Sequence, residues 1–168
     1  MKIPILHLED GDHRIEDVIK AGSLQFYQSE SYPSDINVSA KINKFGSNIS
    51  CQINLKTTAH FNCDRCLSEF DRQIDESFEL LFYLGQKKLE TDEEDIIHLS
   101  PEVKEIDIDP HIREVLILAL PMKHLCNENC QGICAGCGID LNTGKCECRE
   151  KPVDSRWEKL LQIKNQKS

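Results

Sequence analysis

The sequence predicts an α+β fold in which an antiparallel β-sheet, or a partly closed barrel, carries one buried helix and a C-terminal cysteine-rich zinc-knuckle module. Hydrophobic and polar residues alternate over much of 36–82, an apolar helical pattern covers 110–120, and eight of the nine cysteines lie in closely spaced pairs. A chain of 168 residues can bury a core without a staple. We expect a β-rich body at 1–122 and, packed on it, a zinc-knuckle module with a C-terminal tail at 123–168.

Composition excludes several classes of protein. The longest unbroken apolar run, residues 115–120, is far shorter than the roughly 20 residues that a membrane-spanning helix needs. Near the N-terminus, His7, Glu9 and Asp10 interrupt the apolar core that a secretory signal would require. Eight glycines and six prolines are too few for a collagen-like or low-complexity chain. We therefore expect a cytoplasmic protein with no membrane partner.

Charge is distributed unevenly along the chain. The 20 Lys and Arg and the 29 Asp and Glu give a net charge of −9. Residues 1–122 carry −11 and residues 123–168 carry +2. An acidic body repels nucleic acid at long range, so we expect any contact with RNA to be local and to involve the last quarter of the chain.

Three stretches have the period of two that is typical of half-buried β-strands. They are residues 36–42, 49–61 and 70–82. Alternation of this length predicts an antiparallel meander with one face on a core. Cys51 shares the inward parity of Ile49 and Ile53, so we interpret it as a core side chain and not as a ligand or nucleophile.

Four further segments complete the predicted organisation. An acidic block at 90–95 predicts a loop over residues 85–105. Asp109 as a cap, Pro110 at the first position and Pro121 at the end bound a helix that is apolar on nearly all sides, which indicates that it is buried. We also expect a short helix at 15–20 and another in the tail from Asp154 onward.

Cysteine spacing divides eight thiols into two sets of four. In a cytoplasmic protein, which is kept reduced, clustered cysteines indicate a metal more often than disulfides. Cys134 and Cys137 form a zinc-knuckle pattern, because glycine at 136 and 138 allows the positive-φ turn around a tetrahedral ion. Cys146 and Cys148 follow after a tight reversal and complete a local metal site, which we name site 2.

The other four thiols, Cys63, Cys66, Cys126 and Cys130, form a long-range metal site, site 1. Neither pair can complete a four-thiolate shell alone, so together they would clamp the C-terminal module onto the tip of the sheet. Zinc binding at a structural site contributes on the order of 10–16 kcal/mol to folding, which is enough to hold a module with little core of its own. We expect two Zn²⁺ per chain as cofactors, with His124 as a possible substitute ligand.

Three other interpretations of the cysteines stay open. Iron, or an iron–sulfur cluster, uses thiolates at the same spacing. A thioredoxin-like redox pair at Cys63 and Cys66 lacks the βαβ pattern that normally carries one. Catalytic zinc sites keep an open position and usually include histidine or carboxylate ligands, which these pairs lack. No phosphate-binding loop or nucleophile–base pair occurs, so we expect no catalytic residue, no small-molecule substrate and no enzymatic activity.

The combined string of motifs resembles the bacterial YceD family, the large ribosomal RNA subunit accumulation proteins, over about residues 36–161. The motifs are Cys63-Asp64-Arg65-Cys66-Leu67 at a strand turn, Ile106-Asp107-Ile108 before the helix, Leu120-Pro121 after it, Leu125-Cys126, Cys130-Gln131-Gly132-Ile133-Cys134-Ala135-Gly136-Cys137-Gly138, Leu141-Asn142, and Asp154-Ser155-Arg156-Trp157 followed by Leu160. Ile133 and Ala135 stand where we would expect leucine and proline. Some family members lack the later knuckle cysteines and keep the strand-turn pair, which supports the division into two sites.

The resemblance implies a non-enzymatic role in ribosome biogenesis, in the accumulation or processing of large-subunit (23S) ribosomal RNA. We expect the chain to bind this RNA or a pre-ribosomal particle through the zinc-stabilised module. The candidate RNA contacts are Arg65, Lys123, Lys145, Arg149, Lys151, Arg156 and Trp157, of which the tryptophan suits base stacking. Each of them also suits a role without RNA, the charged residues as solvated surface cations and the tryptophan as a core side chain. The alternative function is a protein-interaction adaptor that docks a basic ribosomal protein or an assembly enzyme.

Overall fold

The computed structural model of the protein describes residues 1–5, 8–85 and 96–148. These residues fall into two compact units. Residues 1–64 and 68–126 belong to the first unit, and residues 65–67 and 127–148 belong to the second. Among the described residues, no helix has the length and apolar character needed to cross a membrane.

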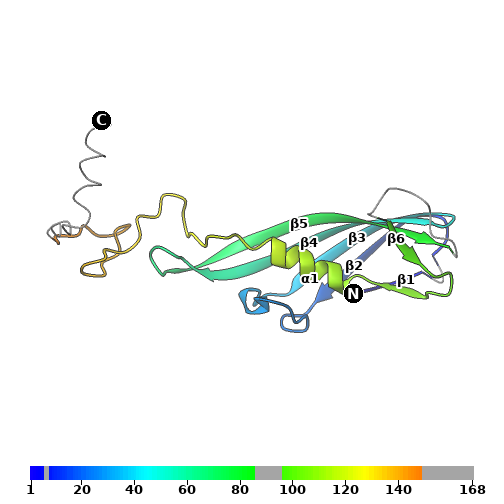
Figure 1. Cartoon of the computed structure of the whole chain (residues 1–168), viewed down its shortest axis with the longest axis horizontal. Helices are drawn as coiled ribbons and strands as arrows, with labels where there is room; N and C mark the ends of the chain where they lie inside the picture. The colour runs from blue at the N-terminus through cyan, green and yellow to red at the C-terminus, as the bar shows by residue number, and fades with distance from the viewer. Residues whose placement is uncertain (6–7, 86–95, 149–168) are drawn as a thin grey trace, which may run out of the picture. The chain divides into compact units, whose positions relative to one another are not determined.

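Two sheets and one α-helix account for the regular structure described in the first unit (Figure 1). The larger sheet has the strand order β2-β3-β4-β5-β6, and the smaller one pairs β1 with β7. The elements are β1 (Lys2–Pro4), β2 (Gly11–Ile19), the short 3-10 helix η1 (Ser29–Ser31), β3 (Ile36–Phe45), β4 (Asn48–Asn62), β5 (Glu69–Leu84), β6 (Ile96–Leu99), β7 (Glu105–Asp107) and α1 (Asp109–Leu118). All strand pairs are antiparallel except β5 with β6, which is parallel.

The core lies between one face of the larger sheet and α1. Side chains of the predicted inward parity, including Ile42, Cys51 and Ile53, are fully buried, because alternate residues of a strand point to the same face. Ile112 and Leu116 from α1 belong to the same apolar cluster. The interpretation of Cys51 as a core side chain is therefore confirmed. Burial raises the pKa of its thiol to about 11, which keeps it protonated at neutral pH.

A long hairpin of β4 and β5 carries one metal-site turn at its end. The two strands pair without interruption from Asn48 with Tyr83 to Asn62 with Glu69. β3 pairs with β4 only as far as Lys56, so residues 57–62 of β4 have β5 as their one strand partner in the described part of the chain. Inward side chains of this end, such as Ala59 and Phe61, are nevertheless buried.

The connection between β2 and β3 is fastened to the end of α1. The buried hydroxyl of Tyr32 donates a hydrogen bond to the carbonyl oxygen of Leu116 at 2.6 Å. That carbonyl belongs to the last turn of the helix, where backbone acceptors lack partners within the helix. The bond therefore stabilises the C-terminal turn of α1.

The α+β class, the three predicted strands and the helix near 110–120 are confirmed, with the helix ending at Leu118. The sheet is open, with β2 and β6 as its edges within the described residues, and its parallel β6 makes it mixed and not purely antiparallel.

Three further expectations were wrong. Residues 15–20 lie largely in strand β2 and not in a helix. The expected loop at 85–105 contains β6 and the first residue of β7. Helix α1 is buried on one side only, since Leu118 is 76% exposed. The acidic block at 90–95 and the tail helix from Asp154 lie outside the described residues.

Candidate metal centre

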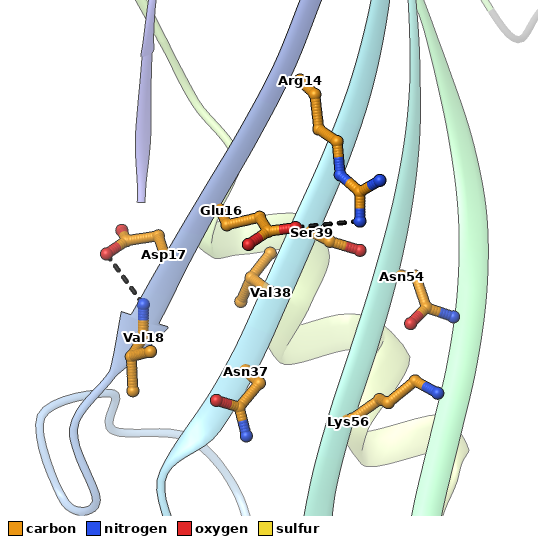
Figure 2. Close-up of a pocket in the computed structure, with 9 residues that line it drawn as sticks. All are labelled: Arg14, Glu16, Asp17, Val18, Asn37, Val38, Ser39, Asn54 and Lys56. Atoms are coloured by element: carbon orange, nitrogen blue, oxygen red, sulfur yellow. Dashed lines mark hydrogen bonds and ion pairs between the residues drawn. The ribbon is translucent and has the colours of Figure 1, made fainter.

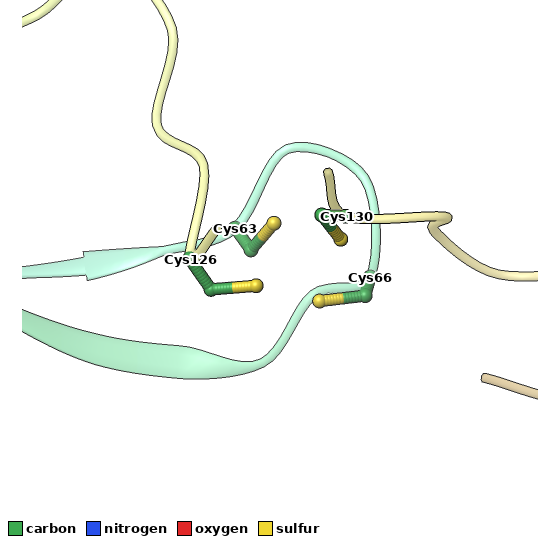
Figure 3. A group of neighbouring side chains, drawn as sticks. All are labelled: Cys63, Cys66, Cys126 and Cys130. Atoms are coloured by element: carbon green, nitrogen blue, oxygen red, sulfur yellow. The ribbon is translucent and has the colours of Figure 1, made fainter. Parts of the chain in front are cut away.

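Four thiols from two distant stretches of chain come together at site 1. The sulfur atoms of Cys63, Cys66, Cys126 and Cys130 lie within 4.8 Å of one another and point toward a common centre (Figure 3). Cys63 and Cys66 belong to the turn between β4 and β5, and the other two follow α1 along the chain. Cys63 is 0% exposed and Cys130 is 2% exposed, whereas Cys66 is half-buried and Cys126 is exposed.

Backbone hydrogen bonds shape the turn at site 1. The amide of Cys63 donates to the carbonyl oxygen of Ser68 at 2.8 Å. The amide of Asp64 donates to the carbonyl oxygen of His124 at 2.7 Å, and the amide of His124 donates to the Asp64 carboxylate at 2.7 Å. The ring of His124 packs edge-on against Phe61, with 4.3 Å between ring centroids. His124 is therefore held as a packing residue, and the group of four sulfurs does not include it.

Arg65 connects the turn to the cysteine-containing segment that follows α1. Its Nη1 donates to the carbonyl oxygen of Cys130 at 2.7 Å, and its own carbonyl oxygen accepts from the amide of Ile133 at 3.1 Å. Gly132 has a φ of 76°, and a Cβ there would lie 3.0 Å from the carbonyl oxygen of Arg65. Glycine is required at this position both by the left-handed backbone and by the close approach. The Arg65 guanidinium, expected as an RNA contact, thus has a structural bond.

Site 2 is a local cluster. The sulfurs of Cys134, Cys137, Cys146 and Cys148 lie within 4.8 Å of one another. The amide of Cys134 donates to the carbonyl oxygen of Ile139 at 2.8 Å, and that of Gly138 donates to the carbonyl oxygen of Cys134 at 2.9 Å. None of the four side chains is fully buried.

The two Cys-x-x-Cys turns end in the same backbone conformation. Gly138, which follows Cys137, has a φ of 76°, and Leu67, which follows Cys66, has a φ of 61°. A left-handed backbone is free for glycine but costs a leucine about 1–2 kcal/mol. Gly136 does not have a positive φ; instead, a Cβ there would lie 3.2 Å from the sulfur of Cys148. Of the two knuckle glycines, Gly138 thus supplies the left-handed residue and Gly136 supplies space.

Hydrogen bonds to sulfur prepare site 2 for a cation. The pKa of Cys134 is lowered to about 6, because the backbone amide of Cys137, the thiol of Cys146 and the amide of Gly136 donate to its sulfur. The pKa of Cys148 is raised, because its thiol donates to the sulfurs of Cys146 and Cys137. A cation bound by these sulfurs would replace the thiol protons.

The two thiol groups fit a tetrahedral ion. With metal–sulfur bonds of about 2.3 Å, a tetrahedral zinc site separates its sulfurs by about 3.8 Å. In site 2 the sulfur of Cys146 lies 3.2 Å from that of Cys134 and 3.6 Å from that of Cys137. In site 1 the side-chain amide of Asn142 donates to the sulfur of Cys130 at 3.4 Å. Four sulfur ligands suit Zn²⁺ and iron alike.

The remaining predicted RNA contacts are only partly described. Lys123 and Lys145 are exposed. Lys145 directly precedes the site 2 residue Cys146. Arg149, Lys151, Arg156 and Trp157 lie outside the described residues.

Sequence reasoning missed a polar groove on the outer face of the sheet, opposite α1. The groove has a volume of about 580 Å³ and is lined by side chains of β2, β3 and β4 (Figure 2). Arg14 pairs with Glu16 of the same strand, β2, at 2.8 Å, whereas Lys56 pairs with Asp75 of β5 at 2.9 Å. The available signal was the absence of any Asp or Glu between residues 36 and 62, in a chain with 29 acids.

Fold and site together define a class: a largely antiparallel sheet protein with two candidate four-cysteine metal centres. The family model of the large ribosomal RNA subunit accumulation protein YceD matches residues 51–164, which is more than half of the chain. The chain belongs to this family, and the resemblance drawn from its motifs is confirmed. The family is named for accumulation of ribosomal RNA and not for a chemical reaction.

Individual relatives support the same assignment. A chloroplastic YCED homologue of Arabidopsis thaliana is 30% identical over 138 residues, which cover 67% of this chain and 43% of the relative. A chloroplastic homologue of Zea mays is 41% identical over 63 residues, or 37% of this chain and 22% of the relative. An uncharacterised protein of Mycobacterium tuberculosis is 31% identical over 102 residues, or 60% and 48%. The chain thus spans less than half the length of these curated relatives. No solved structure matches it.

Proposed function

We propose that this chain is a non-enzymatic ribosome-biogenesis factor that supports accumulation of large-subunit ribosomal RNA by binding that RNA or a pre-ribosomal particle. Membership of the YceD family carries the proposal, because the family is named for this role. Two Zn²⁺ ions would act structurally, since four thiolates around one ion would fill a tetrahedral shell and would leave no open position for a substrate.

Metal at site 1 would join two stretches of chain that are about 60 residues apart in sequence. Cys63 and Cys66 belong to the turn of the β4–β5 hairpin, whereas Cys126 and Cys130 follow α1. One ion bound by all four closes this loop and fixes the turn that Arg65 and Asp64 already hold by hydrogen bonds. The function proposed for site 1 is therefore to present the hairpin turn and the following cysteine segment as one rigid surface.

Charge favours a second candidate function, an adaptor that docks a basic ribosomal protein or an assembly enzyme. The chain carries −9 before any metal is counted. Four thiolates around one divalent ion add about −2 at each site. Such a surface attracts a basic protein more strongly than it attracts RNA.

Affinity purification of the tagged full-length chain tests the proposed function. We expect large-subunit ribosomal RNA to be enriched over small-subunit RNA, and Cys66→Ser to abolish this enrichment by opening site 1. Cys51→Ala is the matched control, because Cys51 is a buried thiol outside both sites. Recovery of neither ribosomal RNA nor ribosomal proteins would contradict the RNA-binding function and the docking of a ribosomal protein.

A binding comparison separates the two candidates. Purified chain is titrated with large-subunit RNA free of protein and, separately, with basic ribosomal proteins free of RNA. Binding to the RNA supports the first function. Binding to the proteins without binding to the RNA supports the adaptor. Salt dependence provides a further readout, since contacts with phosphates weaken steeply as salt rises.

A further inference from the structure

The two sulfur clusters differ in how far water reaches them. At site 1, Cys63 and Cys130 are buried, with exposures of 0% and 2%. At site 2, Cys134 and Cys146 are half-buried, and Cys137 and Cys148 are exposed. Oxidants react with the thiolates that they can reach, so site 2 offers four accessible sulfurs where site 1 shields two.

Side chains around site 1 are also more tightly packed than those around site 2. Site 1 adjoins the packed pair of Phe61 and His124, and Asp64 adds two hydrogen bonds to His124. Around site 2, the nearby apolar side chains Ile133 and Ile139 are each 39% exposed, so they form no core there. The segment 134–148 is therefore held mainly by its backbone hydrogen bonds and by whatever its sulfurs bind.

Site 2 also places two sulfurs ready to join. The sulfurs of Cys134 and Cys146 lie 3.2 Å apart, and those of Cys137 and Cys146 lie 3.6 Å apart. No large movement is needed for one of these pairs to bond, because all four sulfurs already lie within 4.8 Å of one another.

We propose that site 2 is a reversible, oxidant-sensitive metal site, and that site 1 keeps its ion under the same conditions. The inference rests on the metal binding proposed above. A peroxide takes two electrons from two thiolates of site 2, most directly those of Cys134 and Cys146. A sulfur–sulfur bond forms, the oxygen–oxygen bond breaks, and the two oxygen atoms take up two protons from solution and leave as two water molecules. The ion then has two thiolate ligands in place of four and leaves.

Release of the ion changes the local structure and leaves the sheet intact. Residues 134–148 lose the ligand that organises them, whereas the apolar core of the first unit contains none of these residues. A dithiol reductant exchanges with the new disulfide, restores the thiolates and allows metal to bind again. Site 2 would thus switch residues 134–148 between an ordered and a loosened state according to the oxidant level.

Metal release from the full-length protein, purified with its metal, tests this inference. Hydrogen peroxide is added, released metal is followed with a chromogenic chelator, and each cysteine is scored by differential alkylation and peptide mass spectrometry. We expect half of the bound metal to leave about tenfold faster than the rest, because exposed thiolates react first. Cys134, Cys137, Cys146 and Cys148 should show the oxidation, and dithiothreitol with added metal should reverse it.

A variant tests the inference without relying on the difference between the two release rates. Cys146→Ser should bind one ion per chain, and that ion should resist peroxide at the concentration that empties half of the wild-type sites. Cys51→Ala, the control, should behave like the wild type. Equal release rates for both ions, or earlier oxidation of Cys63 and Cys66, would overturn the inference and leave the proposed metal binding standing. Protein purified without any metal would instead contradict the metal binding itself.

Discussion

Asp64 and His124 bond reciprocally: the amide of each donates a hydrogen bond to an oxygen of the other, both at 2.7 Å. Asp64 lies between the cysteines of the hairpin turn, and His124 lies two residues before Cys126. The pair brings together the two stretches that supply site 1, independently of any ion.

Removing the Asp64 carboxylate should weaken this pairing. We expect Asp64→Ala to lower the free energy of unfolding by about 1–2 kcal/mol, because the amide of His124 loses its acceptor. Asp64→Asn keeps a side-chain oxygen and should lose less. Urea titration measures the free energy, and chelator competition measures the metal affinity of site 1. Wild-type values for Asp64→Ala in both experiments would show that the bond contributes nothing.

Protein purified without added metal should contain two ions per chain by elemental analysis. Removal of both by a chelator should loosen the end of the β4–β5 hairpin first, because residues 57–62 pair with β5 alone in the described chain. Two paired strands without further support are only marginally stable. Amide hydrogen exchange should therefore speed up at 57–62 and stay slow at 49–55, where β3 and β5 flank β4. Uniform acceleration over both segments would contradict this account.

Stability should fall in alkaline solution through two buried groups. Burial raises the pKa of Cys51 from 9.0 to about 11 and that of Tyr32 from 10.0 to about 12. As the pH rises above 9.0, the unfolded chain releases these protons first, so the native state binds more protons and is progressively disfavoured. The combined variant with Cys51→Ala and Tyr32→Phe should show a smaller loss between pH 8 and pH 11, by urea titration at each pH. Tyr27→Phe, at an exposed side chain, should leave the pH dependence unchanged.

The residues that end the two cysteine turns should respond oppositely to substitution. Leu67→Gly should raise the free energy of unfolding by about 0.5–1 kcal/mol, because relief of the left-handed strain exceeds the added entropy of the unfolded chain. Gly138→Ala should lower stability or metal affinity at site 2 by about 1 kcal/mol through backbone strain alone, since a Cβ there meets no atom within 4 Å. Thermal unfolding and chelator competition report both changes. A loss of stability in Leu67→Gly would indicate that the leucine side chain makes stabilising contacts.

Sequence pattern predicted the central sheet because strands β3 and β4 bury one face along most of their length, and β5 buries Ile74 and Phe82 on the same face. Their alternation is long, and inward exceptions such as Arg72 and Glu76 are few. β2 was missed for the opposite reason. As an edge strand it carries His13 and Asp17 at positions that pair with the buried Ile42 and Val38, so its apolar period is broken. Charged residues on the inward side of an edge strand also discourage pairing with other chains.

Short strands formed by distant partners left no local signal. β1 pairs with β7 although about 100 residues separate them, and each has three residues. The helix misled in another way: apolar residues lie on nearly all of its sides, but only Ile112 and Leu116 are buried. The structure groups the eight cysteines in the same two sets that spacing suggested. Two cysteines close together in one turn can bind the same ion, so each pair enters its set as a unit.

The unbroken register between β4 and β5 limits how the gene can change length. A single inserted or deleted codon in either strand would rotate every following side chain to the opposite face, and would put polar residues in the place of Ile53 and Leu55. It would also shift Cys63 along the hairpin relative to Cys66. Alignments of relatives should therefore place their gaps at the turns, and length variation within the hairpin should occur as matched changes in both strands.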